Sequence, residues 1–561
     1  MRQHVFLPKL WTSLRGYRMH DFWRDAMAGL VVAVIGIPLS IALSIASGMT
    51  PEQGLITAFV GGFIVSAFGG SRVQIAGPSG AFVVIVVGLA ANYGLAGVLT
   101  CMFLAGVILM LMGLFRMGDL IRYIPFPVTT GYTNAVAALI FSTQIDSLLG
   151  LRLANIPSDF LPKWGYYLSH LGNTHLPAVL VAGLTLVVMI ALGRFLPKIP
   201  GTLVAIAVAT AVVFFAKLDV DTIGSTFGML KPEIPAPIVP ELSWSHIGEL
   251  IGPAFAMAML IAIESLLSAV VSDGMINGNH RSNTELIALG AANSLTAMFG
   301  GIPLTGAIAR TAASIKAGAR TPIAGICSAL FIFVFFTLLT PLLAYVPMPA
   351  LAAVLVMVSY NMTSWSSFSQ LPKAPKSDAA VFLLTFVLAL FFDVIMALEV
   401  GVILSMFLFM KRMAEMTGFH YMRGSDLRTG GEKEPESIGF RIDPEAIGVG
   451  DEVDIYEIKG PFFFGAASIF LDKIKMIEKA PKVLILKMTE VPVIDASGYY
   501  SLTRLLTLIE KYEMRLLVCE LQASTRATLE KFGFFHQIGH ENVYPTLEEA
   551  FSSLHFTTEG K

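Results

Sequence analysis

Two breaks rich in glycine and proline interrupt apolar runs at corresponding places in the two halves of this chain. The first reads Phe68-Gly-Gly-Ser-Arg and continues to Gly77-Pro-Ser-Gly80; the second reads Phe299-Gly-Gly-Ile-Pro and continues to Gly306-Ala-Ile-Ala-Arg310. When the two Phe-Gly-Gly starts are aligned, Ser79 falls opposite Arg310. Paired interruptions of this kind in two halves of a membrane protein indicate broken helices that meet around a substrate site.

The composition is that of an integral membrane protein. Of 561 residues, 55% are hydrophobic and 14% are charged, and the mean hydropathy is +0.72, whereas soluble domains carry about 25% charged residues. The formal net charge of -2 argues against a nucleic-acid partner. Cys101, Cys327 and Cys519 are scattered and form no Cys-x-x-Cys pair, so we expect neither a disulfide framework nor a zinc site.

Sequence signatures of enzymes are missing. The chain contains no phosphate loop of the form G-x-x-x-x-G-K-[ST], no H-E-x-x-H zinc motif and no G-x-S-x-G nucleophile motif. We therefore expect no enzymatic activity, no cofactor, no bound metal and no ATP hydrolysis within this chain.

Apolar runs predict fourteen membrane segments, seven in each half of the chain. The predicted segments span residues 22–47, 52–69, 80–92, 95–115, 126–149, 177–195 and 200–216, then 250–272, 285–300, 306–317, 321–340, 345–359, 377–393 and 396–413. A full crossing needs about 20 residues, so the segments at 80–92 and 306–317 are interpreted as half-helices. An odd number of segments in each half inverts the second half relative to the first, and an even total places both termini on one side.

Basic residues place that side in the cytoplasm. Residues 1–21 carry several arginines and a lysine and are predicted to be a cytoplasmic or interfacial segment, and Lys411 and Arg412 follow the last span. We therefore predict a multi-pass protein of the cell inner (plasma) membrane with both termini cytoplasmic. Its transport domain spans residues 22–416, with repeat one at about 22–216 and repeat two at about 250–416.

The composition changes near Gly418. Residues 417–449 are polar and rich in glycine and are predicted to be a linker. Residues 450–557 show apolar strands at 454–458, 482–487 and 515–520 that alternate with helices at 466–479, 498–512 and 523–531. Such alternation favours crossover connections and predicts a small α/β domain with a mostly parallel sheet.

The chain resembles the SulP anion transporters, the sulfate permease and solute carrier group, that end in a cytoplasmic STAS domain. The resemblance covers nearly the whole chain and is carried by the two Phe-Gly-Gly breaks, Glu264-Ser-Leu-Leu-Ser-Ala-Val-Val-Ser-Asp273, Asn283-Thr-Glu-Leu286 with Gly290 and Asn293, and Val493-Ile-Asp-Ala-Ser-Gly498. It implies an α-helical polytopic membrane fold with fourteen segments in two inverted seven-segment repeats, plus the small cytoplasmic α/β STAS domain. It also implies a core domain that moves against a gate domain, and a homodimer.

By the same resemblance, Ser79 and Gly80 begin the first half-helix, and Ala309 and Arg310 begin the second. Helix N-termini direct free N–H groups and a partial positive charge at one point, which favours anion binding. The alternative is that the glycine-rich breaks only allow close helix packing.

The remaining pocket residues follow from the resemblance and from the charge of Arg310. Leu39 and Leu43 on the first span are implied to close the pocket. An arginine at membrane depth needs an anionic partner, which we expect to be the substrate or Glu264. The alternative is that the Arg310 side chain extends to the membrane surface.

Glu264 is the acidic residue well inside a predicted core span, and a carboxylate there can carry a proton between the two sides of the membrane. In related bicarbonate carriers, this position and a hydroxyl one turn later bind sodium together with the second break. Ser268 retains that hydroxyl, but Ile308 replaces another, and Arg310 stands where sodium carriers have a small residue. These departures favour proton coupling; the alternative is that Glu264 forms a structural ion pair.

Two further motifs receive structural interpretations. The Asp495-Ala496-Ser497-Gly498 loop resembles the loop in which STAS-domain sporulation regulators are phosphorylated, but Ala496 replaces the serine that accepts phosphate there. Asp495 is therefore expected to cap the following helix. Asp273, Asn279 and His280 follow the eighth span and are expected to have a capping or surface role.

The sequence thus predicts a secondary active transporter of small anions. We expect proton-coupled symport of a dicarboxylate, sulfate or bicarbonate by an elevator-like alternating-access mechanism. Alternatives are a sodium-coupled bicarbonate symporter, an anion exchanger, an anion channel and, in another class, a non-transporting anion sensor that signals through the STAS domain. Expected partners are the anion, the co-transported proton, membrane lipid, a second copy of the chain and a cytosolic protein that binds the STAS domain.

Overall fold

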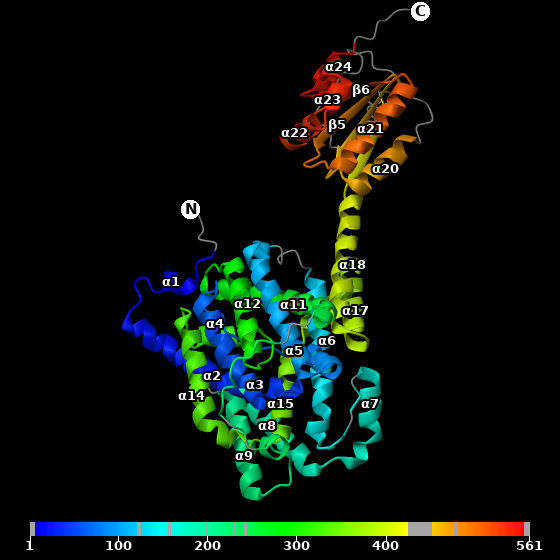
Figure 1. The fold of residues 1–561 in the computed structure, drawn as a ribbon. Helices are drawn as coiled ribbons and strands as arrows, with labels where there is room; N and C mark the ends of the chain where they lie inside the picture. Colours follow the sequence, from blue (N-terminus) through cyan, green and yellow to red (C-terminus); the bar gives the residue numbers. More distant parts are fainter. Residues whose placement is uncertain are drawn as a thin grey trace, which may run out of the picture. The chain divides into compact units, whose positions relative to one another are not determined.

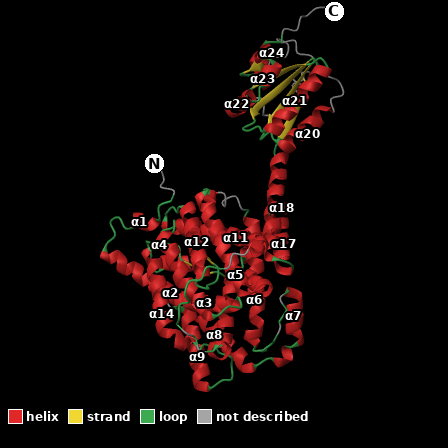
Figure 2. Ribbon diagram, viewed as in Figure 1, coloured by secondary structure: helices red, strands yellow, loops and turns green. Residues whose placement is uncertain are grey.

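A computed structural model describes residues 6–119, 125–154, 156–157, 159–196, 200–228, 230, 232–240, 244–423, 452–475 and 481–554 of the chain. The chain forms two compact units, Met1–Ser405 and Met406–Lys561 (Figure 1). Unit 1 is almost entirely helical, whereas unit 2 contains a five-stranded sheet (Figure 2). Eight described helical stretches are long and apolar enough to cross a membrane, and Gly201–Ala216 is a shorter apolar helix.

The first repeat begins after the short helix α1 (Lys9–Ser13). Its elements are α2 (Met19–Ala46), α3 (Pro51–Ile56), the π-turn η1 (Thr57–Gly61), α4 (Gly62–Phe68), β1 (Ala76–Pro78), the 3-10 turn η2 (Gly80–Phe82), α5 (Val83–Leu114), α6 (Phe126–Leu149), α7 (Phe160–Ser169), η4 (Leu171–Asn173), α8 (Leu176–Phe195) and α9 (Gly201–Ala216). The short helix α10 (Ile223–Phe227) follows.

The second repeat has the same order of elements. They are α11 (Trp244–Ile276), α12 (Ser282–Met298), β2 (Leu304–Gly306), α13 (Ile308–Lys316), α14 (Ile323–Leu343), α15 (Met348–Met362), α16 (Trp365–Gln370), η5 (Leu371–Lys373), α17 (Lys376–Phe391) and α18 (Val394–Glu415). In both repeats a short strand precedes the third helical segment, as the paired breaks predict.

The two predicted half-helices differ in how they continue. In α5, Gly94 has a φ of 66°, a left-handed conformation that ends the first half-helix and starts a full crossing within one helical stretch. Helix α13 contains only 9 residues. At 1.5 Å per residue it covers about 14 Å, roughly half of a hydrocarbon core that is about 30 Å thick. Its N-terminus can therefore lie well inside the membrane.

The helices of unit 1 pack in two groups. Helices α2 to α5 pack mainly against α11, α12 and α14, and α13 packs against α2 and α11; we call this group the core. Helix α6 packs against α15 and α17, and helix α8 packs against α9 and α15; we call this group the gate. The core contains the first four segments of each repeat, and the gate contains later segments of both repeats. This is the polytopic arrangement that the sequence predicts.

Unit 2 contains the sheet order β3-β4-β5-β6-β7. Its elements are β3 (Gly418–Arg423), β4 (Val453–Lys459), α20 (Phe464–Lys475), β5 (Val483–Glu490), α21 (Ala496–Lys511), β6 (Arg515–Cys519), α22 (Ala523–Lys531), α23 (Phe534–Ile538), η6 (His540–Asn542), β7 (Val543–Tyr544) and α24 (Leu547–Ser552). Strands β4 to β7 are parallel and β3 is an antiparallel edge. Alternate strand residues pack against α20 to α23 on one face of the sheet and against α24 on the other.

Two sequence expectations for unit 2 can be compared with the structure. Residues 418–423 fall in the predicted linker but form β3, because Phe419 stacks on Phe470 in the core under α20. Residues 424–449 of the predicted linker lie outside the described residues. Asp495 caps α21 as expected, since its Oδ1 accepts a hydrogen bond of 2.8 Å from the backbone N–H of Gly498.

Lys487 on β5 is the centre of a buried ion network, and its removal is expected to destabilise unit 2. Its Nζ lies 3.1 Å from Glu457 and 3.7 Å from Glu520, with side-chain exposures of 9%, 3% and 24%. Removing one member of a buried ion pair typically costs about 3–5 kcal/mol, because the partner charge stays buried. We expect Lys487→Ala to lower the free energy of unfolding by about 3 kcal/mol, as measured by urea denaturation.

Lys482 provides the matched control for this prediction. Its Nζ lies 2.7 Å from Glu452, but the lysine side chain is 71% exposed. Solvent-exposed pairs contribute about 0–1 kcal/mol, so Lys482→Ala should leave the urea midpoint nearly unchanged. Equal effects of the two substitutions would contradict the assignment of a buried network.

Candidate functional site

The two breaks meet as a short antiparallel pair of strands inside unit 1. In this crossing of β1 and β2, Ala76 lies opposite Gly306, Gly77 opposite Thr305, and Pro78 opposite Leu304. The N–H of Ala307 extends the pairing by donating to the carbonyl of Ile75 at 2.9 Å. The antiparallel geometry brings the start of each half-helix next to the break of the other repeat, as inverted repeats require.

Each break is also held by the second span of the opposite repeat. The Gln53 amide on α3 donates to the carbonyl of Gly300 at 2.8 Å, and Thr57 Oγ1 on η1 accepts from Ile302 N–H at 2.7 Å. In the other repeat, Glu285 Oε2 on α12 accepts from the N–H groups of Gly70 at 2.6 Å and Ser71 at 2.9 Å. Polar side chains buried in the core thus satisfy the backbone where the helices are interrupted.

The N-terminus of α13 offers unpaired N–H groups. Its N-cap residue is Ala307, which has no side-chain acceptor, and in the described part of the chain no acceptor faces the N–H groups of Ile308 and Ala309. Ala309 is exposed and Ile308 is 42% exposed, so this helix end faces open space. In the other repeat, Ser79 caps η2 weakly, at 3.4 Å from Ala81 N.

Glu264 on α11 links the two breaks. Its Oε2 accepts hydrogen bonds from Ser79 Oγ at 3.0 Å and from Thr305 Oγ1 at 3.2 Å. The side chain is half-buried, and no lysine, arginine or histidine pairs with it among the described residues. The structural ion pair considered from the sequence is therefore not present in the described part of the chain.

Arg310 is turned into the core. It is 4% exposed, and its Nη2 donates to the carbonyl of Pro78 at 2.8 Å. A Cβ atom added at Gly77 would lie 2.0 Å from Arg310 Nη1, so the guanidinium requires glycine at that position. The side chain is buried and does not extend out of the core, and no carboxylate pairs with it in the described residues.

The predicted partnership of Arg310 with Glu264 is not observed. The Arg310 side chain lines a small cavity between α2, α4 and α14, where Ser66 and Ser328 also lie. The Glu264 carboxylate instead lies on α11 against Ser79 and Thr305. The crossing therefore keeps the positive and the negative side chain apart, because they belong to different elements that approach it from different directions.

The remaining predicted pocket residues lie around Gly80. Leu43 is buried, and its side chain lies next to Gly80, together with Ile140 of α6 and Met362 of α15. The first half-helix thus begins where the core meets two gate helices. Leu39 is half-buried on α2 and packs against the main apolar core, with no hydrogen-bonding role.

Ser268 and three residues that the sequence analysis missed complete the site. Ser268 Oγ is buried without a partner and makes no hydrogen bond to Glu264 in the described residues. Thr305 bonds Glu264, Ser265 Oγ accepts from Gly306 N–H at 3.0 Å, and the buried Gln74 amide contacts Gly306. Thr305 and Ser265 lie inside quoted motifs, so a search of those motifs for hydroxyl groups could have found them.

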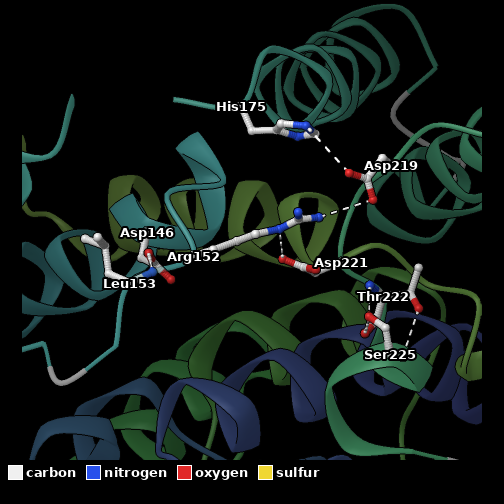
Figure 3. Close-up of polar contacts among 8 residues, drawn as sticks. All are labelled: Asp146, Arg152, Leu153, His175, Asp219, Asp221, Thr222 and Ser225. Atoms are coloured by element: carbon white, nitrogen blue, oxygen red, sulfur yellow. Dashed lines mark hydrogen bonds and ion pairs between the residues drawn. The ribbon is translucent and has the colours of Figure 1, made fainter. Parts of the chain in front are cut away.

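A second polar cluster joins gate elements away from the crossing (Figure 3). Arg152 contacts Asp221 at 3.0 Å and Asp219 at 3.4 Å, and His175 lies 3.9 Å from Asp219. The three acidic and basic side chains of the two Arg152 pairs are 44–78% exposed, and exposed pairs contribute little stability. The cluster therefore connects the loop after α6 to the loop after α9 and is not part of the crossing.

Half-helices that meet at mid-membrane in inverted repeats define the architecture of a secondary transporter. The chain belongs to the sulfate permease family, whose family profile matches residues 22–385, and the STAS domain profile matches residues 447–550. It is thus a membrane transporter with a C-terminal STAS domain, and not an enzyme.

Relatives match nearly the whole length of the chain. It is 36% identical over 538 residues to the putative sulfate transporter YvdB of Bacillus subtilis, covering 95% of this chain and 98% of the relative. It is 25% identical over 548 residues to the bicarbonate transporter BicA of Picosynechococcus, covering 94% and 93%.

Solved structures share the fold. The structure of SLC26A9 has a TM-score of 0.84 at 18% identity and covers 97% of this chain and 92% of that chain. The transmembrane domain of a cyanobacterium bicarbonate transporter BicA has a TM-score of 0.60 at 25% identity, covering 69% and 98%. The likeness to SLC26A9 concerns the fold alone.

Proposed function

We propose that this protein is a secondary active transporter that carries a small anion, sulfate, bicarbonate or a dicarboxylate, together with a proton. The observation that carries the proposal is the uncapped N-terminus of α13 beside Arg310. Free N–H groups at a helix start attract anions, and Arg310 has no acidic partner among the described residues. A bound anion would balance this buried positive charge.

The substrate site consists of Ser79, Gly80, Ala309 and Arg310, closed by Leu39 and Leu43. Ser79 and Ala309 offer polar groups from the two half-helices. Arg310 acts from behind the crossing, since its guanidinium is bonded to Pro78 and is not directed at the half-helix ends. The positive field at the site therefore comes from two helix ends and one fixed charge.

Glu264 is proposed to carry the co-transported proton. Its carboxylate is half-buried, bonds hydroxyl groups from both breaks and has no cationic partner in the described chain. A carboxylate in this position can take up a proton as the anion binds, so that the proton and the anion cross the membrane together. An elevator-like displacement of the core against the gate would then carry both, because the whole crossing lies within the core.

Sodium-coupled bicarbonate symport is the second candidate, and a specific observation favours it. Three hydroxyl groups are available around Glu264. Ser79 and Thr305 bond its carboxylate, and Ser268, one turn further along α11, has an Oγ without a partner in the described residues. Thr305 thus supplies a hydroxyl that the sequence analysis did not credit, and hard cations are bound by oxygen ligands. The similarity to BicA over 94% of this chain supports bicarbonate as a substrate.

The membrane setting is proposed from the sequence. Both termini lie in the cytoplasm of a cell whose inner (plasma) membrane holds the protein, which acts as a homodimer surrounded by lipid. The STAS domain, residues 450–557 preceded by the linker, binds a cytosolic protein. Exposed apolar side chains such as Phe215, which is 82% exposed, and Phe407, which is 60% exposed, suit a lipid environment.

Uptake into proteoliposomes tests the proposal. Labelled sulfate, bicarbonate and fumarate should be offered with a pH gradient, with a sodium gradient and with neither. We expect at least one anion to accumulate when the inside pH is higher than the outside pH. Accumulation driven only by sodium would select the second candidate, and counterflow without accumulation would indicate an exchanger. Binding without any translocation would overturn transport and favour the sensor.

A further inference from the structure

A cavity of about 590 Å³ lies between the core and the gate. Ile263, Leu266 and Val270 of α11 form one wall, and Phe126 and Thr129 of α6 form the facing wall. Val270 is 50% exposed and Phe126 is 70% exposed, so the cavity is open rather than sealed. Its volume falls in the range of about 300–1,000 Å³ that is typical of small-molecule sites.

The cavity runs along α11 to one face of unit 1 and starts at the level of the candidate site in the chain of α11. Its wall begins at Ile263, the neighbour of Glu264, and ends at Asp273. At 1.5 Å per residue, this part of α11 is about 15 Å long. The far end lies at the face where Lys9 N–H donates to the carbonyl of Gly69 and Arg281 N–H to that of Gly70, which we call the N-terminal face.

A carboxylate and an imidazole stand together at that end of the cavity. Asp273 Oδ2 accepts the backbone N–H of His280 at 2.6 Å and lies 2.7 Å from His280 Nδ1, while His280 Nε2 lies 3.1 Å from Ser282 Oγ. The side chains of His280 and Asp273 are only 6% and 14% exposed. Of the capping or surface role expected from the sequence, capping fits this pair, because Asp273 accepts the backbone N–H of His280 and both side chains are largely buried.

Charged groups lie near the pair. Lys9 of α1 acts on Asp273, and Glu285 of α12 acts on both Asp273 and His280. Arg72 and Arg281 lie close to Lys9, and Asp119 follows Gly118, which lines the cavity. Burial, and next the neighbouring Arg281, lower the pKa of Lys9 from its ordinary value, whereas Asp273 acts in the opposite direction. The mouth thus combines cations that attract an anion with a carboxylate that repels it.

We propose that the Asp273–His280 pair sets the charge at the mouth of the anion's route on the N-terminal face, and so makes anion access from that face depend on pH. This inference rests on the proposed transport function. With a protonated imidazole the pair is neutral, and the anion meets the attraction of Lys9 and Arg281. With a neutral imidazole the pair carries one negative charge, which opposes the anion. Histidine is the side chain suited to such a change near neutral pH.

The effect should appear in the concentration dependence of transport and not in its maximal rate. The pair lies at the end of the route, about 15 Å along α11 from Glu264, and touches neither break. One charge acting over that distance through solvated protein changes affinity by about fivefold. We therefore expect the pair to contribute about a fivefold rise in the KM for wild-type exchange between pH 5.5 and pH 8, with maximal rates that change much less.

The experiment is exchange of labelled sulfate across proteoliposomes that hold the full chain, with the same pH on both sides. Sulfate is the probe because its own charge stays constant over this range. His280→Gln keeps a polar side chain that can bond Asp273 but cannot gain a charge. Its KM should therefore lack the fivefold component of the rise with pH, while any pH dependence that Glu264 contributes stays as in wild type. Asp273→Asn removes the repelling carboxylate, so at pH 8 its KM should be about fivefold below the wild-type value.

The outcomes distinguish a failure of this inference from a failure of the proposed transport function. If wild type exchanges no sulfate in this assay, the proposed sulfate transport fails. If wild type exchanges sulfate and the KM of His280→Gln rises with pH as much as that of wild type, the pair does not set the mouth charge. A loss of maximal rate at unchanged KM would show a structural role only. Should His280→Gln fail to fold, Asp273→Asn carries the same test with the opposite expected shift.

Discussion

Replacing Arg310 by methionine is expected to weaken anion binding about 100-fold while leaving the unliganded protein as stable as wild type or more so. Arg310 is 4% exposed, its guanidinium bonds only the carbonyl of Pro78 among the described residues, and its Nε has no partner there. A buried charge without a counter-charge costs desolvation free energy, and arginine keeps its charge in proteins. We expect the bound anion to offset this cost. Removing the guanidinium charge should therefore also remove most of the affinity for the anion.

Thermal unfolding with and without substrate separates the two effects. Ligand binding stabilises a protein by an amount that depends on ligand concentration divided by Kd. Wild type should therefore show a rise in Tm with anion that Arg310→Met lacks, and the Tm of unliganded Arg310→Met should be equal or higher. Methionine fills most of the volume, so the pocket beside Gly77 is not left empty.

Arg320 supplies the matched control. It lies beyond the other end of the same half-helix, and its side chain is exposed. Arg320→Met removes the same charge from the chain but not from the crossing, and anion affinity should change by less than about twofold because exposed charges are screened. If Arg310→Met binds anion as tightly as Arg320→Met does, the charge of Arg310 is not part of the substrate site.

The breaks and the half-helices were predictable because glycine and proline act locally. Phe299-Gly-Gly-Ile-Pro cannot continue a helix, and a segment such as α13 is too short to cross a membrane whatever surrounds it. The parallel sheet of unit 2 was predictable for the same kind of reason, since strand–helix alternation restricts the connections. The family resemblance supplied the residues that begin each half-helix.

The relation between Arg310 and Glu264 was not predictable from the sequence. Sequence spacing places both near a break, but which side of the crossing each side chain occupies depends on how β1 pairs with β2 and on which neighbours leave room. Glycine at position 77 provides that room for Arg310. The contacts of Gln53 and Glu285 with the opposite break were likewise hidden, since they join residues more than 200 positions apart.

Replacing Glu264 by glutamine is expected to abolish accumulation driven by a pH gradient while preserving anion binding and exchange. Glutamine has the same length, and its carbonyl oxygen can accept the hydrogen bonds that Ser79 and Thr305 donate to Glu264 at 3.0 and 3.2 Å. The link between the two breaks should therefore survive. Glutamine cannot release a proton, however. The core therefore carries the same number of protons when it moves with the anion and when it returns without it.

The measurement is uptake into proteoliposomes with the inside pH higher than the outside pH, with counterflow recorded in parallel at equal pH. Wild type should concentrate the anion, whereas Glu264→Gln should only equilibrate it, a loss of accumulation to about the level without a gradient. Counterflow by the variant should remain within about threefold of wild type, because the hydrogen bonds at the crossing are kept. Loss of both activities would mean that the substitution damaged the site.

Ser268→Ala distinguishes the proton from sodium as the coupled ion. Ser268 Oγ is buried without a partner one helical turn from Glu264, so its removal leaves the crossing intact. If Glu264 carries a proton, Ser268→Ala should still accumulate anion in response to a pH gradient. If the pair holds sodium, both variants should lose accumulation driven by a sodium gradient, since each removes an oxygen ligand. If Glu264→Gln still accumulates anion in response to a pH gradient, another group carries the proton, because glutamine at this position does not titrate.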